Sequence, residues 1–257
     1  MTVEVYSWEP NASSGKPLLC LHEKQVPFVH HYVDMGQREH HEPAFLAINP
    51  GGTVPALVHD GLVLTESTPM MEYIDDAFPG PPLRPTEPAL RWRMRWLMRV
   101  IDDSVCPALA MIACNALDAP RFRDTPEEEK REALARIPDP ERRRIWDLLM
   151  HDATPFEEIE ESRRRVADGL ALLEKILGEN PYLAGPAFSL ADICTMATFY
   201  HLPTSRPDEV SAKRTPNLWA WLARCHARPG LQAGFAMGRG MTTERARQAR
   251  VALGLEA

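Results

Sequence analysis

The sequence predicts an α/β domain followed by an all-helical domain. Three observations lead to this fold class. Strand and helix patterns alternate through the first eighty residues, a cluster of three prolines and one glycine follows at 79–82, and only helical periodicity is found after that cluster. We expect the first domain at residues 1–80 and the second at residues 88–257. A chain of 257 residues is long enough for two domains that each bury a core.

The first domain begins with a strand, a helix and a second strand. Val3 and Val5 alternate with more polar neighbours, which predicts a half-buried strand. After a loop at 9–17, Pro17 is expected to open a helix, because a proline in the first helical position loses no hydrogen bond. The second strand is predicted through 28–33.

The first domain ends with a hairpin and a helix. Two apolar runs, 55–59 and 62–64, are joined by Asp60 and Gly61, a dipeptide typical of two-residue hairpin turns. A helix is predicted from about residue 66 to residue 78. With a further helix between the second strand and the hairpin, the order is β-α-β-α-β-β-α, which is typical of a thioredoxin-like unit.

The second domain shows only helical patterns. Apolar stripes at helical spacing run through 92–105 and 156–177. A capping box at 189–192 opens another apolar helix, and the tryptophan-containing helix that follows is expected to end at 228–230. The segment 240–257 is expected to be either a helix or a loose tail.

Composition excludes several classes of protein. A formal charge of −7 argues against nucleic-acid binding. No stretch approaches 18 consecutive apolar residues and no secretion signal begins the chain, so neither a membrane partner nor export is expected. No histidine spacing typical of metal binding occurs, and no metal is expected. An odd number of scattered cysteines is typical of thiols in the cytoplasm: Cys20, Cys106, Cys114, Cys194 and Cys225.

Three motifs carry a resemblance to a known family. They are Asn-Pro-Gly-Gly-Thr-Val-Pro-Ala-Leu at 49–57, Glu66-Ser67, and Phe-Ser-Leu-Ala-Asp-Ile at 188–193. In this order and spacing the chain resembles the glutathione S-transferase superfamily over nearly its whole length. The resemblance implies glutathione as co-substrate and a dimeric assembly.

Further motifs are similar to one branch, the bacterial glutathione-dependent β-aryl-etherases of lignin breakdown. The loop reads Ser14-Gly15-Lys16-Pro17, matching the Ser-x-Lys-Pro form of that branch. An extended middle at 137–146 is expected between two helices, where ordinary transferases have less chain. Ser13 is a departure from this pattern, because some members of the branch carry a different polar residue at that position.

The loop serines are the candidates for activating glutathione. A thiol with a pKa of about 8.5 is mostly protonated at neutral pH, and a hydroxyl that donates to the sulfur favours the thiolate. We favour Ser14 by position and keep Ser13 as the alternative; either could instead simply cap the helix. The loop contains no cysteine, which argues against a disulfide-exchanging enzyme.

Other residues are expected to hold the tripeptide. A cis Val54-Pro55 bond would turn the backbone of Val54 outward to pair with the cysteinyl unit; the alternative is an ordinary trans turn proline. Glu66 and Ser67 open a helix whose N-terminus suits the γ-glutamyl group; alternatively, Ser67 simply caps that helix. By resemblance, His40 or His41 would contact the glycyl carboxylate.

The resemblance implies that glutathione thiolate displaces a phenolate from the carbon beside a ketone, leaving a thioether. Such a substrate requires an apolar, aromatic pocket, for which the candidates are Trp92, Met94, Trp96, Met98, Met111, Trp146 and Tyr200. Each could equally belong to the core. Two alternatives remain: a generic transferase acting on another electrophile, and a catalytically silent glutathione-binding subunit.

Overall fold

The computed structural model of the chain describes residues 2–256 and contains two compact units. The described part of the first unit consists of residues 2–33, 54–101 and 170–256. The second consists of residues 34–53 and 102–169. Each unit is described by itself below.

The first unit holds a four-stranded sheet in the order β2-β1-β3-β4. Its strands are β1 (Val3–Ser7), β2 (Val29–Tyr32), β3 (Ala56–His59) and β4 (Leu62–Leu64). β1 pairs in parallel with β2 and antiparallel with β3, and β3 pairs antiparallel with β4. All four predicted strands are therefore confirmed.

The hairpin turn between β3 and β4 has the geometry that its sequence predicts. Asp60 and Gly61 have φ angles of 46° and 87°. Positive values at both central residues match the twist of the flanking strands, and an Asp-Gly pair tolerates them.

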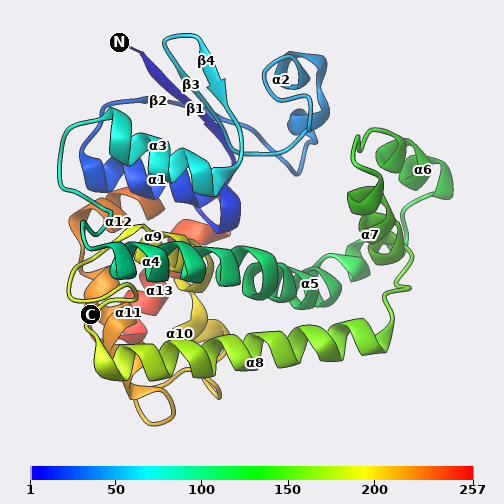
Figure 1. Cartoon of the computed structure of the whole chain (residues 1–257). Helices are drawn as coiled ribbons and strands as arrows, with labels where there is room; N and C mark the ends of the chain where they lie inside the picture. Colours follow the sequence, from blue (N-terminus) through cyan, green and yellow to red (C-terminus); the bar gives the residue numbers. More distant parts are fainter. Residues whose placement is uncertain (1, 257) are drawn as a thin grey trace. The chain divides into compact units, whose positions relative to one another are not determined.

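Helices account for the rest of the first unit. α1 (Ala12–Lys24) packs against α3 (Ser67–Ala77), and both lie on one side of the sheet (Figure 1). α1 buries Leu18, Leu19 and Leu21 completely. It also contacts two later helices, so it lies at the centre of this unit. The remaining elements are α4 (Pro88–Val100), the C-terminal part of α8 (Phe156–Glu179), α9 (Leu190–Phe199), α10 (Leu202–Ser205), α11 (Pro216–His226), α12 (Pro229–Phe235) and α13 (Met241–Ala252).

One helix boundary differs from the sequence prediction. α1 begins at Ala12, so Pro17 lies inside the helix and does not open it. α11 ends at His226, ahead of 228–230 as predicted, and Pro229 then begins a further helix, α12. Each proline fixes a helical φ wherever it stands, and tertiary packing decides where the helix starts. Of the two options for 240–257, the helix is observed as α13.

The predicted capping box is confirmed and forms a buried network. Asp192 is fully buried and accepts hydrogen bonds from the Ser189 N–H (2.8 Å) and from the Ser189 hydroxyl (2.9 Å). It also accepts from the Leu183 N–H (3.0 Å) and from the Trp221 indole N–H (2.8 Å). Burial nevertheless raises the pKa of Asp192, because desolvation disfavours the charged carboxylate.

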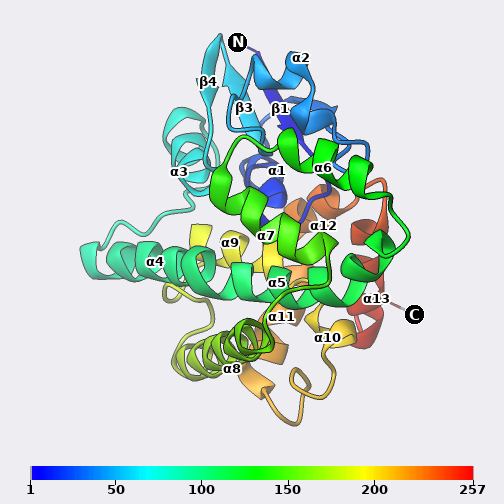
Figure 2. The ribbon, with the colours of Figure 1, turned by 90° about the vertical axis from the view of Figure 1, so that its right-hand side faces the viewer.

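The second unit contains no strand within its described residues, which are all those at 34–53 and 102–169. The helices α6 (Glu127–Ala135) and α7 (Pro140–Met150) lie side by side (Figure 2). The extended middle is shorter than expected, because α7 begins at Pro140, and Arg142 and Trp146 lie within the helix. Asp139 caps it by accepting from the Arg142 N–H at 2.6 Å. The elements are η1 (Glu39–His41), α2 (Pro43–Leu46), most of η2 (Ile101–Val105), α5 (Cys106–Leu117), η3 (Ala119–Phe122), α6 (Glu127–Ala135), α7 (Pro140–Met150) and the start of α8.

The apolar content of one helical stretch exceeds the sequence expectation. By length and composition alone, Pro88–Leu117 could cross a membrane, with a mean hydropathy of 1.5 over its most apolar 18 residues. The sequence predicts no such helix, because it contains no uninterrupted apolar run of 18 residues. The present criterion instead uses the mean hydropathy of a window, which allows it to include Asp102 and Asp103. One helix that meets a criterion of length and composition alone is weak evidence of a membrane span. None of the five cysteines, all within the described residues, forms a disulfide.

Candidate active site

Ser13 and Ser14 lie in the first turn of α1. Asn11 has extended backbone (φ −132°, ψ 167°) and is the residue before the helix, and its carbonyl accepts from the Gly15 N–H at 2.8 Å. The sequence predicts the serines in a loop ahead of the helix, but they are among its first residues. The amides of a first helical turn have no partners within the helix, and they stabilise a negative charge that lies close to them.

The two serines have different surroundings. The Ser14 side chain is buried, and its hydroxyl oxygen accepts from the Trp8 N–H at 2.7 Å. That bond occupies a lone pair and leaves the hydroxyl proton for donation to another acceptor. Ser13 is exposed. Both could meet a thiol at the helix N-terminus, so the choice of Ser14 over Ser13 stays a prediction.

A second helix N-terminus lies beside this turn. Glu66, which precedes α3, has φ 67° and ψ 104°, a conformation that costs a non-glycine residue roughly 1–3 kcal/mol. Such conformations are concentrated at ligand-binding sites. Ser67, the first residue of α3, is buried, and the hydroxyl of Thr68 accepts from the Lys16 ammonium group at 3.2 Å. The α1 and α3 N-termini are therefore joined by a hydrogen bond.

The Val54-Pro55 peptide bond is cis, as predicted. Pro55 is buried and directly precedes β3. The pairing of Val54 with an extended peptide stays a prediction.

His40 and His41 form a close pair in η1 of the second unit. Their ring centroids are 3.9 Å apart, and in the described residues neither Nδ1 atom has a hydrogen-bond partner. Burial, with the neighbouring His41 and nearby arginines, lowers the pKa of His40 to about 4. Burial also lowers the pKa of His41. Both rings are therefore neutral near pH 7 and able to donate one N–H to a carboxylate. Their contact with glutathione stays a prediction.

The structure gives the seven predicted pocket residues different environments. In the first unit, Met94 and Met98 are buried in the core, whereas Trp92 and Trp96 are 65% and 38% exposed and stack on each other. Tyr200 is also buried there. In the second unit Met111 and Trp146 are half-buried. Their contact with a substrate stays a prediction.

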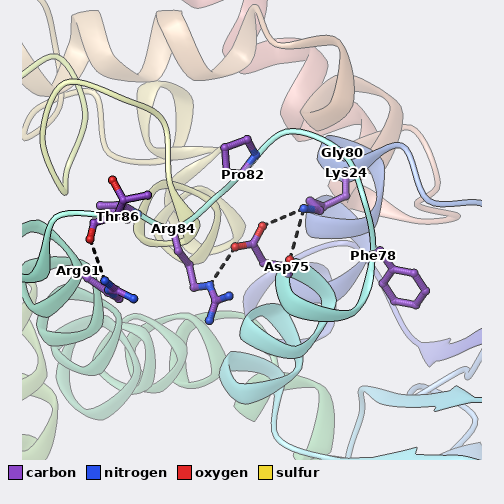
Figure 3. A pocket seen from close by; sticks show the side chains of 9 residues that line it. Lys24, Asp75, Phe78, Gly80, Pro82, Arg84, Thr86 and Arg91 are labelled. Atoms are coloured by element: carbon purple, nitrogen blue, oxygen red, sulfur yellow. Dashed lines mark hydrogen bonds and ion pairs between the residues drawn. The ribbon is translucent and has the colours of Figure 1, made fainter.

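A cavity of about 420 Å³ lies elsewhere in the first unit, and none of these seven residues lines it (Figure 3). Its polar groups are occupied: Asp75 accepts from Lys24 (3.0 Å), from the Leu83 N–H (3.0 Å) and from Arg84 (2.9 Å). Burial opposes the charge of Asp75, but these bonds hold its pKa below the ordinary value. The polar groups that line the cavity therefore hold residues 79–87 in place, and the cavity is not a candidate site.

Sequence reasoning misses the residues that support the serine turn. Glu9 and Asn11 belong to the same loop as Ser14, yet the motif gives them no role. The acidic Glu9 shortly before the helix indicates a residue that supports the turn, but only the structure shows that it is buried and which groups it contacts.

Known proteins match this chain along most of its length. The family profile for the glutathione S-transferase N-terminal domain matches residues 12–77, and that for the C-terminal domain matches residues 106–229. Protein LigF of Sphingobium sp. (strain NBRC 103272 / SYK-6) is 38% identical over 243 residues, 91% of this chain and 93% of its own length. Glutathione S-transferase PARB of Nicotiana tabacum is 27% identical over 239 residues, 91% of this chain and 98% of its own.

A solved structure is similar as well. The crystal structure of beta-etherase LigF from Sphingobium sp. strain SYK-6 superposes with a TM-score of 0.86 at 37% identity, covering 92% of this chain and 99% of that one. The fold, the two domain profiles and the extent of these matches agree. The chain belongs to the glutathione S-transferase family.

Proposed function

We propose that this protein cleaves β-aryl ether bonds of lignin-derived aromatic ketones with glutathione. The observation that carries the proposal is the likeness to beta-etherase LigF in both sequence and structure, over nine-tenths of the chain. The Ser-x-Lys-Pro turn at the start of α1 supports the same assignment.

The reaction is a nucleophilic substitution. Glutathione thiolate attacks the ether-bearing carbon next to the ketone, the carbon–oxygen bond breaks, and its electron pair leaves with the phenolate. The products are a glutathione thioether and a phenol. Because a phenol has a pKa of about 10, the leaving group requires no strong general acid.

The chain's contribution is to make the thiolate and to align it with the carbon. Ser14, with Ser13 as the alternative, donates a hydrogen bond to the sulfur, and the α1 N-terminus stabilises its charge. Residues 1–80 carry glutathione and residues 88–257 supply the aromatic pocket. The tripeptide is held by Val54, Pro55, Glu66 and Ser67 and by His40 or His41, and the pocket candidates are those named above.

A dimer in the cytoplasm completes the proposal. Trp92 and Trp96 stack in parallel on α4, with ring centroids 5.9 Å apart, and Leu62 and Val63 on β4 are 51% and 44% exposed. A contiguous exposed apolar patch marks a surface that pairs with another protein, and the stacked Trp92–Trp96 pair supports such a patch on α4. Thiol cysteines support the cytoplasm.

A generic transferase is the second candidate. The similarity to glutathione S-transferase PARB over 91% of this chain favours it. A shared fold fixes the glutathione chemistry more firmly than the electrophile.

The test is phenol release from a model β-aryl ether ketone by the purified protein, with and without glutathione. We expect glutathione-dependent release and an equimolar thioether. No release, together with conjugation of a general electrophile, would leave the generic transferase. Binding of glutathione with neither reaction would leave the silent subunit.

A further inference from the structure

Glu9 is a buried carboxylate between the serine turn and the C-terminal segment 238–243. One carboxylate oxygen, Oε1, accepts from the Tyr32 hydroxyl (2.8 Å) and from the backbone N–H groups of Arg239 (3.0 Å) and Gly240 (2.9 Å). These amides directly precede α13, where a negative charge is favourable. The Arg239 guanidinium lies 4.4 Å from the centre of the Tyr32 ring. Glu9 thus holds a segment that comes about 230 positions later in the chain.

A second contact joins the same two segments. The Asn11 side-chain amide donates to the Thr242 hydroxyl at 3.0 Å. Burial raises the pKa of Tyr200, whereas the Thr242 and Asn11 side chains act to lower it. Both ends of the stretch 9–11 are therefore fixed to residues from α9 onward.

The backbone of this stretch sets the position of Ser14. Trp8, next to Glu9, donates its N–H to the Ser14 hydroxyl. The Asn11 N–H donates to the Glu9 carbonyl at 2.7 Å. Gly15 packs so closely that a Cβ there would lie 2.5 Å from the Pro10 carbonyl carbon. Moving Glu9 would therefore move the donor that orients Ser14.

We propose that Glu9 is a positioning residue for thiol activation: by binding the Arg239 and Gly240 amides and the Tyr32 hydroxyl, it makes the C-terminal segment part of the active-site support. This proposal rests on the proposed function, because it assumes that Ser14 acts on the glutathione sulfur. The effect of Glu9 is on the charge state of the sulfur and not on the affinity for the tripeptide.

The chain offers a matched control at the other end of α1. Glu23 is also buried and accepts from Arg228 (2.6 Å) and from the Leu231 N–H (3.1 Å), so it too anchors a C-terminal segment. It lies at the end of α1 away from the serines. A purely structural role of Glu9 would make the two carboxylates equivalent.

The experiment measures the pKa of enzyme-bound glutathione from the ultraviolet absorbance of its thiolate, with kcat, KM and Tm, for full-length variants. Glu9→Ala should raise the thiol pKa by about one unit, which reduces the thiolate fraction and kcat about tenfold at a pH well below the thiol pKa of the natural enzyme, with KM for glutathione changed less than about threefold. Glu9→Gln keeps an acceptor oxygen and should recover most of kcat. Glu23→Ala should lower Tm without moving the thiol pKa.

If the Glu9→Ala variant does not fold, Gly238→Ala is the replacement test. A Cβ at Gly238 would lie 2.6 Å from Thr243 Oγ1 and 2.8 Å from Glu9 Oε2, so it displaces the carboxylate together with the Thr243 hydroxyl, without removing either group. It should shift the thiol pKa in the same direction as Glu9→Ala. The proposal is overturned if Glu9→Ala, or Gly238→Ala in its place, leaves the thiol pKa unchanged while Ser14→Ala raises it. If Ser14→Ala and Ser13→Ala both leave it unchanged, the thiol activation in the proposed function fails instead.

Discussion

Replacing Ser14 by alanine tests both the fold of the serine turn and the chemistry proposed for it. The substitution removes the acceptor for the Trp8 N–H and the hydroxyl proton offered to the sulfur. Ser13→Ala is the matched control, because it removes the same group from an exposed neighbour in the same turn.

The structure sets the size of each effect. Leaving a fully buried N–H without an acceptor costs about 1–3 kcal/mol. Because the bond between Trp8 and Ser14 is half-buried, Ser14→Ala should lower the free energy of unfolding by about 1 kcal/mol, the lower end of that range. A hydrogen bond to a charged group contributes about 1.5–3 kcal/mol, which corresponds to a rise of roughly one to two units in the pKa of the bound thiol. At constant pH below that pKa, kcat should fall about 10- to 150-fold.

The assay follows phenol release at saturating glutathione across pH 6–9, and urea unfolding gives the stability. The pH at which kcat reaches half its maximum should move upward in Ser14→Ala while the KM for glutathione changes little. A full loss of activity in Ser13→Ala with Ser14→Ala unaffected would assign the role to Ser13. No effect in either variant would refute thiol activation by this turn.

Three further outcomes are expected. Asp192→Ala leaves four buried donor groups without their acceptor and should lower the free energy of unfolding by about 4 kcal/mol in urea, with a smaller loss for Asp192→Asn. Burial lowers the pKa of His226 to about 4. Between pH 6.5 and pH 4 the unfolded chain therefore binds more protons at this histidine than the folded chain does. The free energy of unfolding is unaffected by His226 above pH 6.5 and should fall by about 2 kcal/mol by pH 5. Urea unfolding of His226→Gln at pH 7 and 5 should show a smaller difference than the natural chain. If the protein is the dimer proposed above, changing Trp92 and Trp96 together to alanine should give a monomer in sedimentation. An unchanged mass with a higher KM for the aryl ether would assign both side chains to the pocket.

Features governed by local rules are predictable from the sequence. The Asp60-Gly61 turn follows from the φ angles that these residues tolerate, and the box at 189–192 follows from side chains that reach their own helix N-terminus. The cis bond before Pro55 is predicted through the family resemblance and not from local rules.

The sequence by itself thus determined the strands and most of the helices, because each depends on neighbours a few residues away. Only the tertiary structure decided that α1 starts at Ala12 and that Ser14 is buried under the Trp8 amide. Only the tertiary structure, too, decided which partners hold Glu9. The physical reason is that a buried carboxylate must find its donors in space, and here two of them come from the other end of the chain.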